Sequence, residues 1–344
     1  MDDLFLRVGG QRFYGWKSFS VTRTMESIVN RFDVRAADIE ADRRMLAITD
    51  GDPVELFLDD DLLLTGYLQD ILPDYDDKKH ERLFLGDSRT VDLVDSTTAG
   101  QQFRDQDLLQ VATALAKPYG IAVSATVPVG EKFSYLNIDT GQNVWEFLEY
   151  AGRMRGLRFI ATDTGDMVID EVGSTVSATT LLLGGNVLRA KPRFSHRDRH
   201  SDYTVVSDQP QTESLMGTDS AFVKGSARDP RVRRYRPVHI LSEFAGDIAQ
   251  CNAQALWQSK LAYARSQSVV YTVKGWRDDS GNVWTPNTLV PVRDKYAPLN
   301  ERMLIVEVTT SLSAAGRLTE LLLMKPDALK QTAIPEPEEE STGF

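Results

Sequence analysis

The spacing of apolar residues in this sequence changes along the chain, and that change constrains the fold more than any other feature. Segments with strand-like alternation occupy residues 4–85 and return after residue 186, whereas two segments between them place apolar residues at helical spacing. Strands repeat every two residues and helices every 3.6, so one element type cannot satisfy both patterns. The sequence therefore predicts an α+β fold, mainly β, in which two arrays of hairpins flank a helical centre.

The first array reads as a series of short hairpins. Leu4 to Val8 alternate before the turn dipeptide Gly9-Gly10, and PVELFL (53–58) is followed by an acidic turn and a second apolar strand. Gly66 lies inside that second strand, where a glycine suits a bulge or a close backbone approach in a curved sheet. We expect a closed β-barrel domain over residues 1–95.

The central segment has helical periodicity. One stripe runs from Leu108 to Leu115, and a second runs from Val144 to Met154, with Thr140 or Asn143 as the cap and Gly156 as the stop. A strand between the helices and a hairpin after them complete the pattern. Residues 96–175 are predicted to form a small α/β module.

Strand-like segments resume after the centre and resemble the first array in kind. A basic loop and one long helix at 247–265, with a narrow alanine-lined stripe, interrupt them. We expect a second β-barrel over residues 176–332 that carries this loop and helix as insertions. The acidic, proline-rich residues 333–344 have no apolar period and are predicted to be disordered.

Charge and composition narrow the class of protein. With 39 Lys+Arg against 50 Asp+Glu, the net charge of -11 argues against a dedicated nucleic-acid binder. The single cysteine, Cys251, permits no internal disulfide and suits a reducing compartment. No signal peptide and no apolar run of about 18 residues is found, so membrane insertion is not expected.

Residues that could carry chemistry are sparse. The carboxylates around Asp50 to Asp61 do not have the spacing of a calcium loop, and solvated turns are favoured over a glycosidase pair. His196 and His200 lack the glutamate of a zinc peptidase motif, because Arg197 takes its place. The common hydrolase, P-loop and dinucleotide motifs are absent. We therefore predict no catalytic residue, no cofactor and no metal site, and no enzymatic activity.

Two charged surfaces remain as candidates for contacts. An acidic turn can line a channel through which a polyanion passes without sticking, and this is the interpretation given to Asp59, Asp60 and Asp61. The strongest basic run suits either nucleic acid or the acidic faces of neighbouring subunits, and pairing between subunits is favoured. That run consists of Arg228, Arg231, Arg233, Arg234 and Arg236.

Four stretches resemble, in their order, the baseplate hub family of Mu-like contractile-tailed phages. They are LFLRVGGQRFYGWKSFSVTRTMESIVNRFDV, GDPVELFLDDDLLLTGYLQDI, DTGQNVWEFLEYAGRMRGLRFIATDTGDMVI, and the closing GWRDDSGNVWTPNTLVPVRD with ERMLIVEVTTSLSAAGRLTELLLMKPDA. The resemblance implies a structural subunit with two similar barrels. It further implies a homotrimer, whose ring of approximate sixfold symmetry joins the sixfold tail tube to the threefold spike.

The same resemblance implies the partners and the location. The partners are the central spike protein, the tail tube or distal tube proteins and the tape measure protein, with DNA only as passing cargo. The location is the virion tail baseplate, after assembly in the host cytoplasm. Two other functions stay open: a cell-wall polysaccharide hydrolase that uses the acidic cluster, and a peptidoglycan-binding tail module built on the central α/β segment.

Overall fold

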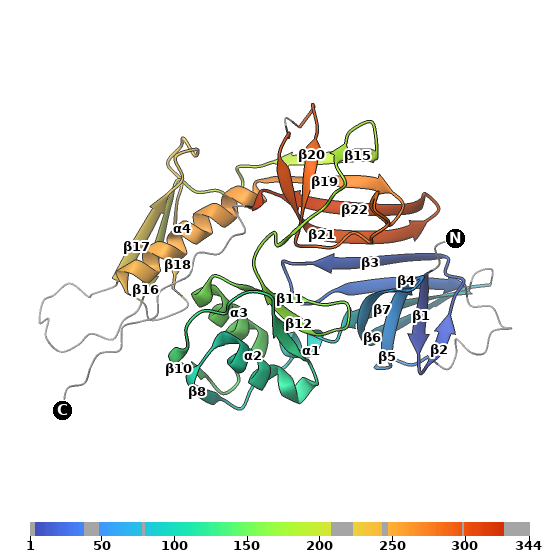
Figure 1. The fold of residues 1–344 in the computed structure, drawn as a ribbon, viewed down its shortest axis with the longest axis horizontal. Helices are drawn as coiled ribbons and strands as arrows, with labels where there is room; N and C mark the ends of the chain where they lie inside the picture. Colours follow the sequence, from blue (N-terminus) through green and yellow to red (C-terminus); the bar gives the residue numbers. More distant parts are fainter. Residues whose placement is uncertain are drawn as a thin grey trace, which may run out of the picture.

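Strands from both ends of the chain dominate this computed structural model, which describes residues 4–37, 48–77, 80–207, 223–242, 247–297 and 299–326 (Figure 1). The strands of the first array are β1 (Leu4–Val8), β2 (Gln11–Phe13), β3 (Ser18–Thr24), β4 (Arg31–Ala37), β5 (Pro53–Leu58), β6 (Asp61–Tyr75) and β7 (His80–Ser88). Those of the second are β13 (Thr175–Val176), β14 (Leu181–Leu182), β15 (Val187–Phe194), β19 (Gln267–Lys274), β20 (Thr288–Arg293), β21 (Arg302–Ser313) and β22 (Gly316–Met324).

The two arrays form one 14-stranded sheet. Its main path is β15-β19-β22-β21-β3-β4-β7-β6-β5-β1-β2, and β20 joins β21 to the short strands β13 and β14. Each half of the path has its own apolar core. Phe19, Leu56 and Phe84 lie in the core of the first half, whereas Tyr271 and Leu321 lie in that of the second.

The prediction of two closed barrels is wrong for the described part of the chain. β21 of the second array pairs antiparallel with β3 of the first, with Thr309 opposite Thr22, so the arrays join each other and neither closes on itself. Alternation in a sequence specifies which face of a strand is buried but not which neighbour pairs with its edge. The mainly β, α+β class is confirmed.

The likeness of the two arrays is confirmed as a shared strand order. In chain order the four main strands are β3, β4, β6, β7 in the first half and β15, β19, β21, β22 in the second. In space both halves run first, second, fourth, third, with every neighbour antiparallel. β5 and β20 each pair with the beginning of their third strand. The third strands carry equivalent bulges, between Leu68 and Asp70 in β6 and between Ile305 and Glu307 in β21.

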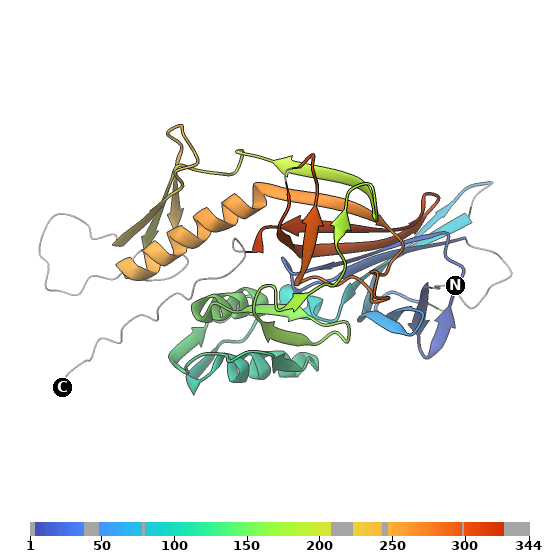
Figure 2. The same ribbon diagram turned by 45° about the horizontal axis from the view of Figure 1, so that its top comes forward.

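A separate layer is inserted between β15 and β19. It contains β16 (Asp202–Ser207), β17 (Val223–Arg228) and β18 (Pro237–Leu241), which pair in the order β17-β16-β18, and helix α4 (Ile248–Arg265). Figures 1 and 2 show this helix lying along the small sheet, with its C-terminal end at the main sheet, where Leu261 packs with Leu304 and Met324. Cys251 and Ala255 of α4 pack against Tyr203 and Val205. The sequence placed these strands in the second barrel, but they form a sheet of their own.

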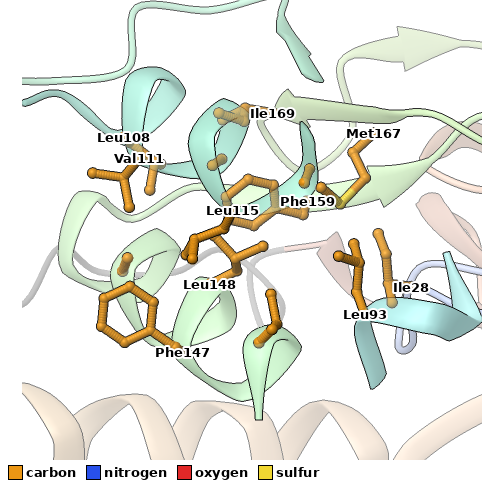
Figure 3. Close-up of a cluster of buried hydrophobic side chains, with 14 of the residues drawn as sticks. Ile28, Leu93, Leu108, Val111, Leu115, Phe147, Leu148, Phe159, Met167 and Ile169 are labelled. Carbon is orange, nitrogen blue, oxygen red and sulfur yellow. The ribbon is translucent and has the colours of Figure 1, made fainter. Parts of the chain in front are cut away.

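The central segment combines helices with short strands. Its elements are α1 (Val91–Asp95), β8 (Gln101–Gln106), α2 (Leu108–Ala116), a 3-10 turn (Lys117–Tyr119), β9 (Val123–Ala125), β10 (Phe133–Ile138), α3 (Val144–Arg155), β11 (Arg158–Ala161) and β12 (Met167–Asp170). The apolar stripes of α2 and α3 meet in one core with Phe159 and Ile169 (Figure 3). Ile28, from the loop between β3 and β4, enters the same core. The first half of the sheet is thereby fastened to the centre.

The helix ends follow the sequence. Asp107 and Gln110 form a capping box at the start of α2, and Asn143, the second of the two expected caps, accepts from the backbone N–H of Glu146 at the start of α3. Gly156 ends α3 in the left-handed conformation with φ 69°. β8 was not expected, because QQFRDQ has one buried residue and no apolar alternation.

Two further expectations concern the C-terminal tail and membrane insertion. The tail 333–344, predicted to be disordered, lies outside the described residues. None of the described helices combines the length and the apolar character that crossing a membrane requires.

Gly66 provides a test of the sheet's geometry. A Cβ at this position would lie 1.9 Å from the backbone oxygen of Asp87 on β7, so Gly66→Ala must push the two strands apart. We expect a loss of about 3 kcal/mol or more in the free energy of unfolding, measured by denaturant titration. Gly185→Ala is the control, because its nearest neighbour, at 3.1 Å, belongs to the side chain of exposed Leu182. Equal stability of the two variants would contradict the close approach.

Candidate assembly surfaces

One face of the main sheet is polar across eight neighbouring strands, from β15 to β6. The two large cores lie on the opposite face, and the registers place alternate residues of each strand on the polar one. At one end of this face a smaller apolar cluster forms instead, where Leu322 and Met324 pack with Leu261 of α4. We call this the polar face. Its residues are Arg189, Lys191, Arg193, Val270, Thr272, Lys274, Leu318, Glu320, Leu322, Glu307, Thr309, Ser311, Ser20, Thr22, Thr24, Arg31, Asp33, Arg35, Leu83, Leu85, Asp87, Asp70, Leu72 and Asp74.

Half-buried carboxylates lie near the middle of the polar face. Asp33 and Asp87 border a hollow of about 310 Å³ that Thr22 and Arg31 also line. Burial raises the pKa of both carboxyls above their usual value, while Ser20 and Arg31 respectively act against the shift. Burial, and then the charge of Glu26, likewise raises the pKa of Glu307. Ionising these carboxyls therefore costs more free energy in the folded protein than in water.

The charge of the polar face differs between its two ends. β15 carries Arg189, Lys191 and Arg193 and no acidic residue. Residues 69–77, which are the outer part of β6 and the start of the following turn, carry four carboxylates and no cation. The eight-stranded polar face is consequently basic at one end and acidic at the other.

The acidic turn Asp59 to Asp61 connects β5 and β6 and contacts the second half of the chain. Asp59 adopts φ 55°. Nη2 of Arg277 lies 3.2 Å from Oδ2 of Asp59, and Nη1 lies 2.6 Å from Oδ2 of Asp61. The hydrogen bond to Asp61 raises the pKa of Arg277 above its usual value. Two of the three carboxylates thus hold the two halves together, and Asp60 is exposed.

The basic loop after β17 is built on a buried ion pair. The side chains of Arg199 and Asp229 are both almost fully buried. Nη2 of Arg199 lies 2.6 Å from Oδ2 of Asp229. Arg199 and Arg231 each lie against the ring of Tyr263, with the guanidinium carbon 5.0 Å and 4.4 Å from the ring centre. This pair fixes the shape of the loop.

The five arginines that the sequence grouped as candidates play different roles in the structure. Nη1 of Arg236 donates to the backbone oxygen of His196 at 2.7 Å, and Nη2 donates to that of Arg197, so Arg236 clamps the preceding turn. Arg231 packs on Tyr263. The side chains of Arg228, Arg233 and Arg234 are exposed, as is Tyr235.

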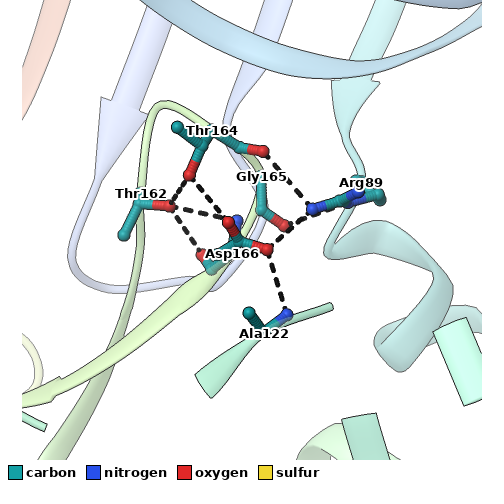
Figure 4. A network of polar contacts seen from close by, with 6 residues as sticks. All are labelled: Arg89, Ala122, Thr162, Thr164, Gly165 and Asp166. Carbon is teal, nitrogen blue, oxygen red and sulfur yellow. Dashed lines mark hydrogen bonds and ion pairs between the residues drawn. The ribbon is translucent and has the colours of Figure 1, made fainter. Parts of the chain in front are cut away.

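Arginines also hold the β11–β12 hairpin between the two halves, and no local pattern in the sequence indicates this. Nη2 of Arg89, which follows β7, lies 2.7 Å from Oδ1 of Asp166, and the same oxygen accepts from the backbone N–H of Ala122 at 3.0 Å (Figure 4). Nη1 of buried Arg23 on β3 lies 3.0 Å from Oδ1 of Asp163, and its Nη2 donates to the backbone oxygen of Trp284. Arg23 thereby touches both halves and the centre.

The described residues include no group of three or more metal-ligating side chains. His196 and His200 lie in a turn and not on a helix, so they lack the geometry of a zinc peptidase motif. Burial raises the pKa of the Cys251 thiol, which disfavours the reactive thiolate.

Three family models match successive parts of the chain. "Mu phage baseplate assembly protein GpP-like, N-terminal" matches residues 3–86, "Baseplate hub protein gp44-like, second domain" matches 90–171, and "Mu phage baseplate assembly protein GpP, fourth domain" matches 247–332. Together they cover both halves of the main sheet and the centre.

Whole proteins match as well. The chain is 28% identical over 331 residues to the baseplate hub protein gp44 of Escherichia phage Mu, covering 93% of this chain and 87% of that protein. The 43 kDa tail protein of prophage MuSo2 from Shewanella oneidensis is 31% identical, with a TM-score of 0.83, covering 95% of this chain and 99% of that one. A tail protein of Neisseria meningitidis shares the fold at 20% identity, with a TM-score of 0.82 over 97% and 99% of the two chains.

Glu307→Gln tests the cost of the half-buried carboxylates. The pKa of Glu307 is raised above 4.5 in the folded protein, so the folded state binds the proton more tightly than the unfolded state. The ionised Glu307 therefore lowers the free energy of unfolding at pH 7. This destabilisation disappears as the pH falls through the folded pKa towards the unfolded one, because the folded state then takes up the proton. We expect the variant to raise the unfolding temperature by roughly 1–2 °C at pH 7 and not at pH 4. Glu131→Gln, at an exposed position, is the control. An increase in the unfolding temperature of Glu307→Gln that does not depend on pH would contradict the raised pKa of Glu307.

Arg199→Met tests the buried ion pair of the basic loop. The substitution leaves the carboxylate of Asp229 buried without its partner, which typically costs about 3–5 kcal/mol. We expect a loss of that size in denaturant unfolding, compared with less than about 0.5 kcal/mol for exposed Arg234→Ala. A small effect of Arg199→Met would show that the pair does not shape the loop.

Proposed function

We propose, because the chain belongs to the baseplate hub family of Mu-like phages, that it acts as a structural subunit that adapts one symmetry of the tail to another. In this proposal three copies form a ring. One face of the ring binds the sixfold tail tube or the distal tube proteins, and the other face binds the threefold spike protein. The ring resides in the virion tail baseplate after assembly in the host cytoplasm. The tape measure protein and DNA pass through its centre.

The internal duplication is the observation that carries this proposal. Each chain presents two four-stranded units with the same strand order and direction, β3-β4-β7-β6 and β15-β19-β22-β21. Three copies around an axis would therefore present six similar units to a sixfold partner while remaining threefold overall. A protein with one such unit would match only the threefold side.

The dimensions of the sheet fit a ring of three. Eight strands from each copy would give about 24, and strands about 4.8 Å apart give a circumference of about 115 Å and a diameter of about 37 Å. Barrels of 16–18 strands already leave an aqueous channel. The polar face would then line the channel, and its mixed charges would offer no continuous positive track to DNA.

We propose the polar face as the channel lining in place of the turn Asp59 to Asp61. Asp59 and Asp61 are engaged by Arg277, so these two carboxylates serve contacts between the halves. The lumen-facing role of the turn, and of Asp60 in particular, stays an untested prediction. The division of the chain at residues 95 and 175 also stays a proposal. It agrees with the separate cores of the sheet and the centre.

We further propose that the subunit is not an enzyme. A glycosidase needs two carboxyl groups free to act as acid and base, whereas the guanidinium of Arg277 occupies both Asp59 and Asp61. Retention on purified cell wall without turnover would favour the peptidoglycan-binding alternative. Turnover that is lost on replacing Asp59 or Asp61 would favour the hydrolase.

The mass of the protein in solution is the direct test of the ring. Light scattering at micromolar concentration should give about 115 kDa, three times the 38.5 kDa of one chain. A monomer under these conditions would contradict the adaptor function.

Charge reversal in the basic loop tests its proposed role in assembly. Arg231, Arg233 and Arg234 changed together to Glu should weaken the oligomer by at least about 10-fold, because acidic faces of neighbouring subunits would then be repelled. The unfolding temperature should fall less than the assembly weakens, since Arg233 and Arg234 are exposed and Arg231 gives up only its contact with the ring of Tyr263. Lys224→Glu, on β17 outside the loop, is the control for a charge reversal at an exposed position and is compared with Arg234→Glu alone. Unchanged oligomer mass would remove the loop from the interface.

A further inference from the structure

Two strands of the polar face have one open side. Among the described residues, β15 pairs only with β19 apart from a single bridge between Val187 and Leu183. The outer part of β6, from residue 69 onward, pairs only with β7 among those residues, because β5 ends opposite Tyr67. Both edges expose apolar side chains: Leu72 is 48% and Tyr75 74% exposed on β6, and Phe194 is 59% exposed on β15. Open edges of this kind are normally protected or paired.

The internal duplication indicates what belongs on these edges. Inside the chain, the third strand of the second half, β21, pairs with the first strand of the first half, β3. The equivalent contact would join the third strand of the first half, β6, to the first strand of the second half, β15. These two strands lie at opposite ends of the eight, so the contact requires a second copy of the chain.

The strand directions permit this contact. All seven neighbouring pairs from β15 to β6 are antiparallel, so the first and eighth strands run in opposite directions. Rotation about a ring axis keeps both the strand direction and the inward face of each copy. β6 of one copy would therefore meet β15 of the next in antiparallel orientation, with the polar faces continuous.

The duplication also predicts the register. The bulges align Asp70 of β6 with Glu307 of β21, so Leu72 and Asp74 take the places of Thr309 and Ser311. The ladders through β4 and β19 align Lys191 and Arg193 with Ser20 and Thr22 of β3 in the same way.

The transferred register brings complementary side chains together. The pairs Thr309 with Thr22 and Ser311 with Ser20 become Leu72 with Arg193 and Asp74 with Lys191. The pair Val308 with Arg23 becomes Ile71 with Phe194, an apolar contact on the opposite face. One residue beyond β6, Asp76 falls opposite Arg189. The backbone ladders alone determine this register, and it places two carboxylates opposite two cations.

We propose that the outer part of β6 docks on β15 of a second copy, in this register, as the contact that closes the ring. The inference rests on the proposed ring and names its interface. Pro73 and Pro192 fall opposite each other and each removes one backbone donor, so the side chains on either side of this point set the specificity. Such prolines also discourage indiscriminate pairing of the two edges with other strands.

Cysteine cross-linking tests the register. Directly opposed residues have Cβ atoms about 4.5–5.5 Å apart, close enough for disulfide formation after small adjustments. Asp74→Cys with Lys191→Cys in one chain should give covalent dimers and trimers on non-reducing gels after mild oxidation. Cys251 is buried, so the unmodified protein should not cross-link. Asp74→Cys with Lys274→Cys is the matched control, because Lys274 lies on the polar face on the inner strand β19.

Charge exchange tests the same contact without a new bond. Lys191→Glu and Asp74→Lys should each weaken the oligomer at least about 10-fold, and the chain that carries both should recover most of the loss. A trimer in light scattering without cross-linking or recovery would overturn this interface and leave the ring standing. A protein that is monomeric without any substitution would instead overturn the ring itself.

Discussion

The antiparallel pairing of β21 with β3 is the contact on which the rest of the structure depends. It joins the second half of the chain to the first across nearly 300 residues of sequence, with Thr22 and Thr309 hydrogen-bonded to each other at 3.1 Å on the polar face. Without this pairing each half would be a small curved sheet with its own core and two open edges. With it, eight strands share one polar face, and the position of each remaining edge is fixed.

Other contacts make that junction rigid by filling the space beside it. The β11–β12 hairpin of the centre is gripped by Arg23 from β3 and by Arg89 from the segment after β7. Ile28, from the loop between β3 and β4, reaches into the core of the centre. Arg277 ties the β5–β6 turn to the second half. These cross-connections oppose hinge motion between the halves, a property that suits the proposed role.

Local features of the fold could be read from the sequence with good accuracy. The stripe from Val144 to Met154, the cap at Asn143 and the stop at Gly156 each lie where the periodicity and capping rules placed them. Gly66 marks a close backbone approach, one of its two expected roles. Family membership was also readable, because the four resembling stretches span nearly the whole chain in order. Closure of the arrays was not readable, since an alternating pattern is the same in a barrel and in an extended sheet.

Local patterns in the sequence predict which residues face a core, where helices begin and end, and that two arrays of the same kind flank a helical centre. Those properties depend on neighbours within a few residues, where periodicity and capping act. No such pattern indicates that the arrays merge through β21 and β3, that Asp59 and Asp61 bind Arg277, or that the five candidate arginines divide into structural and exposed ones. These outcomes depend on partners tens to hundreds of residues away, whose identity is set by the packing of the whole chain and not by any local pattern.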